Sequence, residues 1–111
     1  MASMFEVVVY ETDEGRAPFE AWFNALDTQA ALKVTTAIAR MEAGNLGDVK
    51  PVGQGVSERR ITFGPGFRLY FGHDGKKLVV LLTGGTKKRQ SKDIEQAQAF
   101  WADYKQRKKG G

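Results

Sequence analysis

The sequence predicts an α+β fold with the element order β-α-α-β-β-β-α, and three observations predict it. A β-branched run opens the chain, two segments with apolar residues at helical spacing follow, and three strand-like segments joined by glycine turns come before a last amphipathic segment. Strands linked by consecutive hairpins favour a largely antiparallel sheet, here of four strands, on which the N-terminal helical hairpin would pack. One domain is expected over residues 1–111, with a basic tail from about 105 to 111.

The first half of the chain is expected to hold one strand and two helices. Residues 4–10 are β-branched and aromatic and predict a buried strand. Pro18 suits the first turn of a helix, whose apolar positions recur three and four residues apart: Phe19, Trp22, Phe23 and Leu26. Asp27 or Thr28 can cap a second helix, which Gly44 would end.

The second half is expected to be mostly sheet. Residues 45–55 hold glycines and prolines without periodicity and predict a loop. Strands follow from Val56, from Phe67 and over 78–83, separated by the turns Gly64-Pro65-Gly66 and Asp74-Gly75. After a break at Gly84-Gly85 and a basic loop, Ser91 can cap the final helix.

Composition narrows the class of protein. The 111 residues are 41% hydrophobic and 27% charged and include no cysteine, which excludes disulfides, thiolate zinc sites and cysteine nucleophiles. The longest wholly apolar run, residues 78–82, is far too short to cross a bilayer, and no segment resembles a signal peptide. We therefore expect a cytoplasmic protein with no membrane contact.

The charge is uneven along the chain. Residues 1–50 carry a net charge of −4, residues 51–83 carry +3 and residues 84–111 carry +5. A positive excess confined to the second half indicates a polyanionic partner such as nucleic acid. A solvated basic tail is the alternative for the last residues.

The second and third predicted strands place basic groups on one face. If Phe63 and Phe67 close a three-residue loop, Thr62 lies opposite Arg68, and Arg60 lies opposite Tyr70. The two arginines and the tyrosine then project from the face opposite the apolar side chains, where an anion would relieve the repulsion between the guanidinium groups. A solvated face, with Glu58 pairing one arginine, is the alternative.

A basic loop is expected next to this face. Lys87, Lys88 and Arg89 follow the last predicted strand, and loops held by a rigid sheet are common binding positions. Lysine and arginine bind phosphate and stabilise the charge of a pentavalent phosphorane. A solubilising turn is the alternative. The carboxylates show no metal-ligand spacing, so we expect neither a metal nor a cofactor.

Several motifs resemble a known family and together span nearly the whole chain: Phe19-x-x-Trp22, Gly44-Asn45-x-Gly47-Asp48-x-Lys50, residues 53–61, residues 64–71, residues 81–87 and Gln90-x-x-Asp93-Ile94-x-x-Ala97. In these the sequence resembles the addiction-module killer proteins, the HigB-like branch of the RelE/ParE toxin superfamily. The resemblance implies a RelE-like fold.

The resemblance also implies a function. It implies the toxin of a type II toxin–antitoxin system, neutralised by a cognate helix-turn-helix antitoxin and bound to operator DNA only through that complex. RelE-type members are endoribonucleases that cut mRNA, usually on the ribosome. The family pattern implies that Arg68 stabilises the scissile phosphate, and that Arg60 and either Lys87 or Lys88 are further catalytic or binding groups, with Lys87 expected to be catalytic. The residues expected to bind nucleic acid are Lys88, Arg89, Lys50 and Arg59.

One departure from the family affects the site. The tyrosine or histidine that some relatives use near the last helix is not evident, because Tyr104 is in register with the core. Tyr70 is therefore expected to be the tyrosine of the site.

Two other functions fit the same pattern. The chain could be a ParE-like inhibitor that binds DNA gyrase and performs no chemistry, since one fold hosts both activities. It could also be a regulatory module that acts only with its antitoxin on DNA.

Overall fold

The structure, a computed structural model, describes residues 5–76 and 78–110. Within these residues it contains five strands, three α-helices and one 3₁₀ turn, η1. Their bounds are β1 (Glu6–Val9), α1 (Pro18–Asn24), α2 (Thr28–Glu42), β2 (Val49–Pro51), β3 (Val56–Ile61), β4 (Phe67–Asp74), β5 (Leu78–Thr86), η1 (Lys87–Arg89) and α3 (Gln90–Gly110). The α+β class is confirmed.

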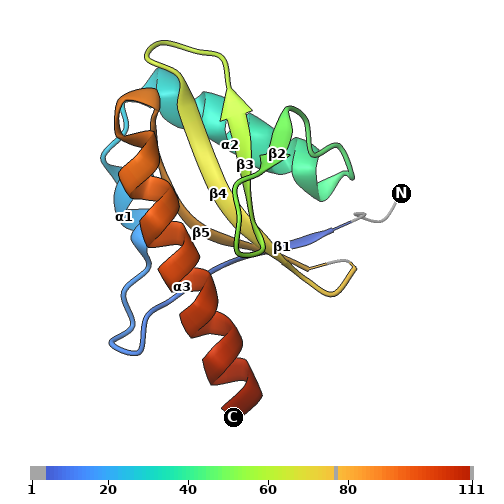
Figure 1. Cartoon of the computed structure of the whole chain (residues 1–111). Coiled ribbons are helices and arrows are strands. Elements are labelled where there is room, and N and C mark those ends of the chain that lie inside the picture. The colour runs from blue at the N-terminus through green and yellow to red at the C-terminus, as the bar shows by residue number, and fades with distance from the viewer. Residues whose placement is uncertain (1–4, 77, 111) are drawn as a thin grey trace.

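All five strands form one sheet with the order β1-β5-β4-β3-β2. β1 runs parallel to β5, and the other neighbours are antiparallel. Helices α1 and α2 cover one face of the sheet, and α3 crosses the other (Figure 1). Each face of the sheet therefore has its own apolar core, and helices cover at least part of both faces.

The signals for the helical hairpin are confirmed. Pro18 opens α1, and Asp27 caps α2 by accepting a hydrogen bond of 2.9 Å from the backbone N–H of Ala30. Gly44 follows the end of α2 with a φ of +98°, a conformation that glycine adopts without a steric cost.

The sheet has one strand more than predicted. Val49–Pro51 lies in the predicted loop over 45–55 but pairs with Ser57–Arg59 as β2. The two strands face each other because the chain turns at Gly53 and Gly55, which have φ values of +94° and +83°. Three residues are too few to show a periodicity in the sequence.

Three predicted boundaries were wrong or incomplete. β5 continues through Gly84-Gly85 to Thr86, and α3 begins before Ser91, directly after η1. The expected basic tail is part of α3 as far as Gly110, because contacts described below hold its last turns. Met4, where the first strand was predicted to begin, and Gly111 lie outside the described residues.

Candidate nucleic-acid interface

The two arginines of the predicted site lie directly opposite each other. In the pairing of β3 with β4, Arg60 faces Arg68 and Glu58 faces Tyr70. The expected pairing of Arg60 with Tyr70 is therefore wrong by two residues, although all four side chains do share one face. We call this surface the Arg60/Arg68 face.

The register differs because β3 ends earlier than expected. Ile61 pairs with Phe67, and the backbone N–H of Phe63 donates to the Ile61 carbonyl at 3.0 Å, which turns the chain out of the strand. Gly64 and Gly66 then take φ values of +55° and +82° in a connection longer than the predicted three residues.

Helix α3 covers much of the Arg60/Arg68 face. Tyr70 is 0% exposed and Arg68 is 7% exposed, and Tyr70 packs in one core with Ala97 and Trp101 of α3. The approach is close, because a Cβ at Gly72 would lie 2.6 Å from the Trp101 ring. Arg60, whose side chain is 40% exposed, is the accessible arginine of the pair.

Glu58 balances both arginines from inside the protein. Its side chain is 0% exposed, and its carboxylate lies 3.8 Å from Nε of Arg60 and 3.8 Å from Nε of Arg68. Gln90 of α3 donates a hydrogen bond of 2.8 Å to the same carboxylate, and Asp48 lies 3.6 Å from Arg60. The anion between the guanidinium groups is thus a residue of the chain itself.

Two further polar groups are buried beside this cluster. The hydroxyl of Tyr70 and Oδ2 of Asp93 have no hydrogen-bond partner among the described residues. Burial, with the neighbouring charge of Glu58, raises the pKa of Tyr70 well above its usual range and so disfavours the phenolate form. Burial likewise raises the pKa of Asp93.

The basic loop is an exposed turn at the end of this face. Lys87–Arg89 forms η1, and the N–H of Lys87 donates to the Gly66 carbonyl at 3.0 Å, which ties η1 to the β3–β4 connection. The three side chains point to solvent at the end of the sheet where Arg60 and Arg68 lie. We call Lys87–Arg89 the basic turn.

Of the remaining two predicted residues, one lies on this face and one does not. Lys50 is exposed on β2 opposite Glu58, and so shares the Arg60/Arg68 face. Arg59 points to the other face, towards α2, where its guanidinium group is buried against Gly47. Arg59 therefore does not join the other predicted residues.

Gln90 and Asp93 belong to the buried cluster but were not predicted to lie there. The sequence signal for this cluster is the pair Gly84-Gly85, which was predicted to end the strand but lies within β5. A Cβ at Gly85 would overlap the carboxylate of Asp93, so this glycine lets the helix approach the strand. A glycine inside a strand often marks such a close approach.

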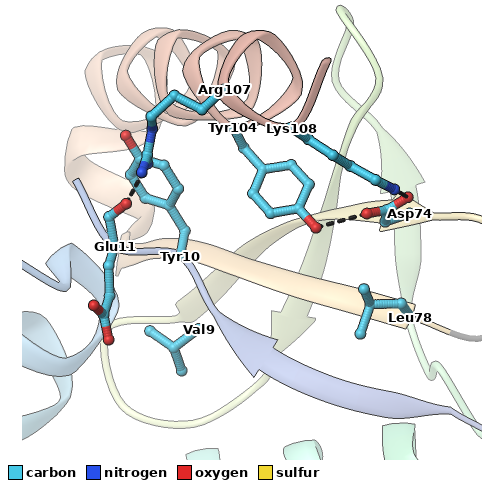
Figure 2. Close-up of a pocket in the computed structure, with 8 residues that line it drawn as sticks. All are labelled: Val9, Tyr10, Glu11, Asp74, Leu78, Tyr104, Arg107 and Lys108. Atoms are coloured by element: carbon cyan, nitrogen blue, oxygen red, sulfur yellow. Dashed lines mark hydrogen bonds and ion pairs between the residues drawn. The ribbon is translucent and has the colours of Figure 1, made fainter. Parts of the chain in front are cut away.

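The C-terminal half of α3 is anchored by its polar side chains (Figure 2). Tyr104 donates a hydrogen bond of 2.6 Å to Asp74, and Lys108 also pairs with Asp74. Arg107 donates to the Glu11 carbonyl beside β1. Burial and the bond to Asp74 raise the pKa of Tyr104 to about 12, and the bond from Lys108 lowers the pKa of Asp74. The residues that make these contacts line an open cavity of about 620 Å³.

The described residues contain neither a cluster of metal-binding side chains nor a membrane-spanning helix. Over residues 5–76 and 78–110, no group of three or more histidine, cysteine, aspartate or glutamate side chains could hold a metal ion. In the same part of the chain, no helix combines the length and the apolar character needed to span a membrane.

The fold and this surface define a small α+β protein with a basic edge built around a buried acid. The family model described as "Phage derived protein Gp49-like (DUF891)" matches residues 21–102, and the chain belongs to this family. The family is associated with toxin–antitoxin systems and is related to RelE-like toxins. An uncharacterized protein of Haemophilus influenzae is 42% identical over 80 residues, which cover 71% of this chain and 81% of that protein.

Proposed function

We propose that this protein is the toxin of a type II toxin–antitoxin system, of the HigB-like kind, and that it cleaves mRNA without a metal. The observation that carries the proposal is the cross-strand pair Arg60–Arg68 next to the exposed basic turn Lys87–Arg89. Guanidinium groups side by side concentrate positive charge at this edge, and an accessible arginine such as Arg60 forms two parallel hydrogen bonds to a phosphate. Membership of a toxin–antitoxin-associated family supports it.

In the proposed reaction the RNA 2′-hydroxyl attacks the adjacent phosphorus. The bond from phosphorus to the 5′-oxygen then breaks, which leaves a 2′,3′-cyclic phosphate and a 5′-hydroxyl. The 2′-oxygen loses a proton as it attacks and the 5′-oxygen takes one up as it leaves, so no water or other reactant is consumed. The half-exposed Arg60 and the exposed Lys87 bind the phosphorane oxygens and stabilise the charge that develops on them, and the nearly buried Arg68 adds its positive charge beside Arg60. Lys50, Lys88 and Arg89 lie on the exposed rim and bind neighbouring phosphates.

Glu58 and Tyr70 have other roles in this proposal. Tyr70 is out of reach of RNA while α3 packs over it, and its raised pKa disfavours the phenolate that a general base requires. Glu58 is a positioning residue, because its buried carboxylate lies 3.8 Å from Nε of each arginine and holds both side chains beside it.

The partners follow from the same proposal. The antitoxin is a helix-turn-helix protein with an acidic segment that covers residues 59–90, where charge complementarity favours it. The complex, rather than the toxin alone, binds operator DNA. The RNA substrate is mRNA on the ribosome.

Induced expression in a bacterial host tests the proposal. We expect growth arrest and new mRNA 5′-ends by primer extension, and loss of both in Arg68→Ala. Arg60→Ala is the second variant, because Arg60 is half exposed and its loss perturbs folding less. Arg16→Ala, which removes a charge from an exposed position outside the site, is the matched control.

The outcomes separate the possibilities. New mRNA ends in the wild type and in the control, and none in the folded Arg60→Ala protein, would support the proposal. Arrest that is unchanged in both site variants, or arrest without new mRNA ends, would overturn it.

Binding to DNA gyrase without chemistry is a second candidate, and one observation favours it. Tyr70 and most of Arg68 are covered by α3, so part of the face assigned to catalysis is closed. Inhibition of supercoiling by purified protein, with intact mRNA in expressing cells, would identify this function instead.

A further inference from the structure

A second basic site lies on the other face of the sheet. A cavity of about 250 Å³ opens between α2 and the end of β3. The polar side chains that line it are Lys33, Thr36, Arg40, Arg59 and Thr62. We call it the Arg59 cavity. It contains no residue of the Arg60/Arg68 face or of the basic turn.

Arg59 is the buried wall of this cavity. Only 8% of the residue is exposed, and its Nε has no hydrogen-bond partner among the described residues. One Nη donates to the Arg60 carbonyl, and the guanidinium group packs so closely on Gly47 that a Cβ there would overlap it. The group is therefore held rigidly, with part of its donor capacity unused.

The cations of the cavity lack an acidic partner. Of the ion pairs among residues 5–76 and 78–110, none includes Lys33, Arg40 or Arg59. Burial and then the neighbouring Arg40 lower the pKa of Arg59; Asp48 opposes this but is already paired with Arg60. Crowded like charges in a partly buried site are stabilised when an anion binds between them.

The donors fit an anion with several oxygens. Two arginines, a lysine and two threonine hydroxyls surround the cavity, and arginine donates to two oxygens of a phosphate at once. We propose that the Arg59 cavity binds a backbone phosphate of RNA, a second contact on the face of the sheet opposite the one assigned to catalysis. The proposal rests on RNA being the substrate.

Continuity of charge favours RNA over an acidic protein segment. Arg59 and Arg60 are neighbours on β3 and point to opposite faces at the same end of the strand. Lys33 lies over the Phe63 ring, 5.3 Å from its centre, beside the connection that also holds the basic turn. Cations thus continue around this end of the sheet, and a flexible phosphate chain can follow them from one face to the other.

NMR titration of the full chain tests the proposal with two probes, inorganic phosphate and a 2′-O-methyl single-stranded RNA of about ten nucleotides. The methylated RNA cannot undergo 2′-hydroxyl attack, so binding is measured apart from cleavage. We expect both probes to shift the amide signals of Thr36, Arg40 and Thr62. Arg40→Ala should weaken RNA binding about tenfold and reduce the slope of log affinity against log salt by about 0.7.

The controls distinguish the cavity from general attraction by a basic protein. Lys33→Ala should weaken RNA binding in the same direction. Lys76→Ala removes an equal charge from an exposed turn at the far end of β4 and should change affinity by less than about twofold. Unchanged affinity in Arg40→Ala, or an equal loss in Lys76→Ala, would overturn the proposal.

A third probe separates the two kinds of partner. If a poly-glutamate peptide shifts the same signals and RNA does not, the cavity binds an acidic protein segment and the RNA assignment is wrong. If the cavity binds RNA but expressing cells show no mRNA cleavage, the site stands and the proposed catalytic function fails.

Discussion

Glu58→Gln removes one negative charge from the interior while keeping the volume of the side chain. The carboxylate lies 3.8 Å from Nε of the nearly buried Arg68, and a pair at this distance attracts by about 4 kcal/mol at an effective dielectric constant of about 20. The pair with Arg60 contributes less, because solvent screens its half-exposed side chain. Removing one partner of a buried ion pair typically costs about 3–5 kcal/mol. We expect the lower end, about 3 kcal/mol, because glutamine keeps one carbonyl oxygen as an acceptor for Gln90.

Urea denaturation followed by tryptophan fluorescence measures this cost. Glu95→Gln is the matched control, because it removes the same charge from an exposed position of α3 and should change the free energy of unfolding by less than about 0.5 kcal/mol. In the double variant with Arg68→Met the loss should be smaller than the sum of the single losses, since the charge that needs Glu58 is gone. A Glu58→Gln protein as stable as the control would refute the assigned role of Glu58.

Two further predictions concern the packing and anchoring of α3. Gly72→Ala places a methyl group 2.6 Å from the buried Trp101 ring and should destabilise the protein by about 1–3 kcal/mol in the same urea assay, whereas Gly110→Ala, with open space around it, should not. Asp74 is stabilised as an anion by Lys108, so its lowered pKa adds stability above about pH 4 that is lost as pH falls through the folded-state pKa. Asp74→Asn should therefore lower the melting temperature at pH 7, and in acid the melting temperatures of the variant and the wild type should converge. A difference in melting temperature that stays the same at all pH values would contradict the assigned role of the Asp74 charge.

Local signals in the sequence were sufficient for most of the fold. The cap at Asp27, the stop at Gly44 and the alternation from Val56 onwards each act within a few residues, and each is confirmed. Strand β2 gave no such signal, because its pairing with β3 depends on the turn at Gly53 and Gly55 rather than on its own three residues.

The candidate site was predictable in its residue types but not in its environment. Alternation along a strand correctly placed Arg60, Arg68 and Tyr70 on one face, because side chains alternate regardless of the loop. The partner of each residue depends on where β3 ends, and the burial of Tyr70 depends on which face α3 covers. The end of β3 is set by the turn from Ile61 to Gly66, whereas the burial of Tyr70 is set by tertiary packing, for which Gly85 was the local sign.

The parallel pairing of β1 with β5 has a consequence for how the chain acquires this fold. Glu6 pairs with Leu78 and Val9 with Leu81, so the first strand meets a partner about 70 residues further along the chain. Synthesis proceeds from the N-terminus, and β1 with its three valines therefore has no neighbouring strand until β5 has been made. Closing so long a loop is slow, whereas the hairpins β3–β4 and β4–β5 close locally. The first strand of the sheet to be made is thus among the last to be fixed in place, and until β5 is made the new chain exposes an unpaired strand edge that favours aggregation.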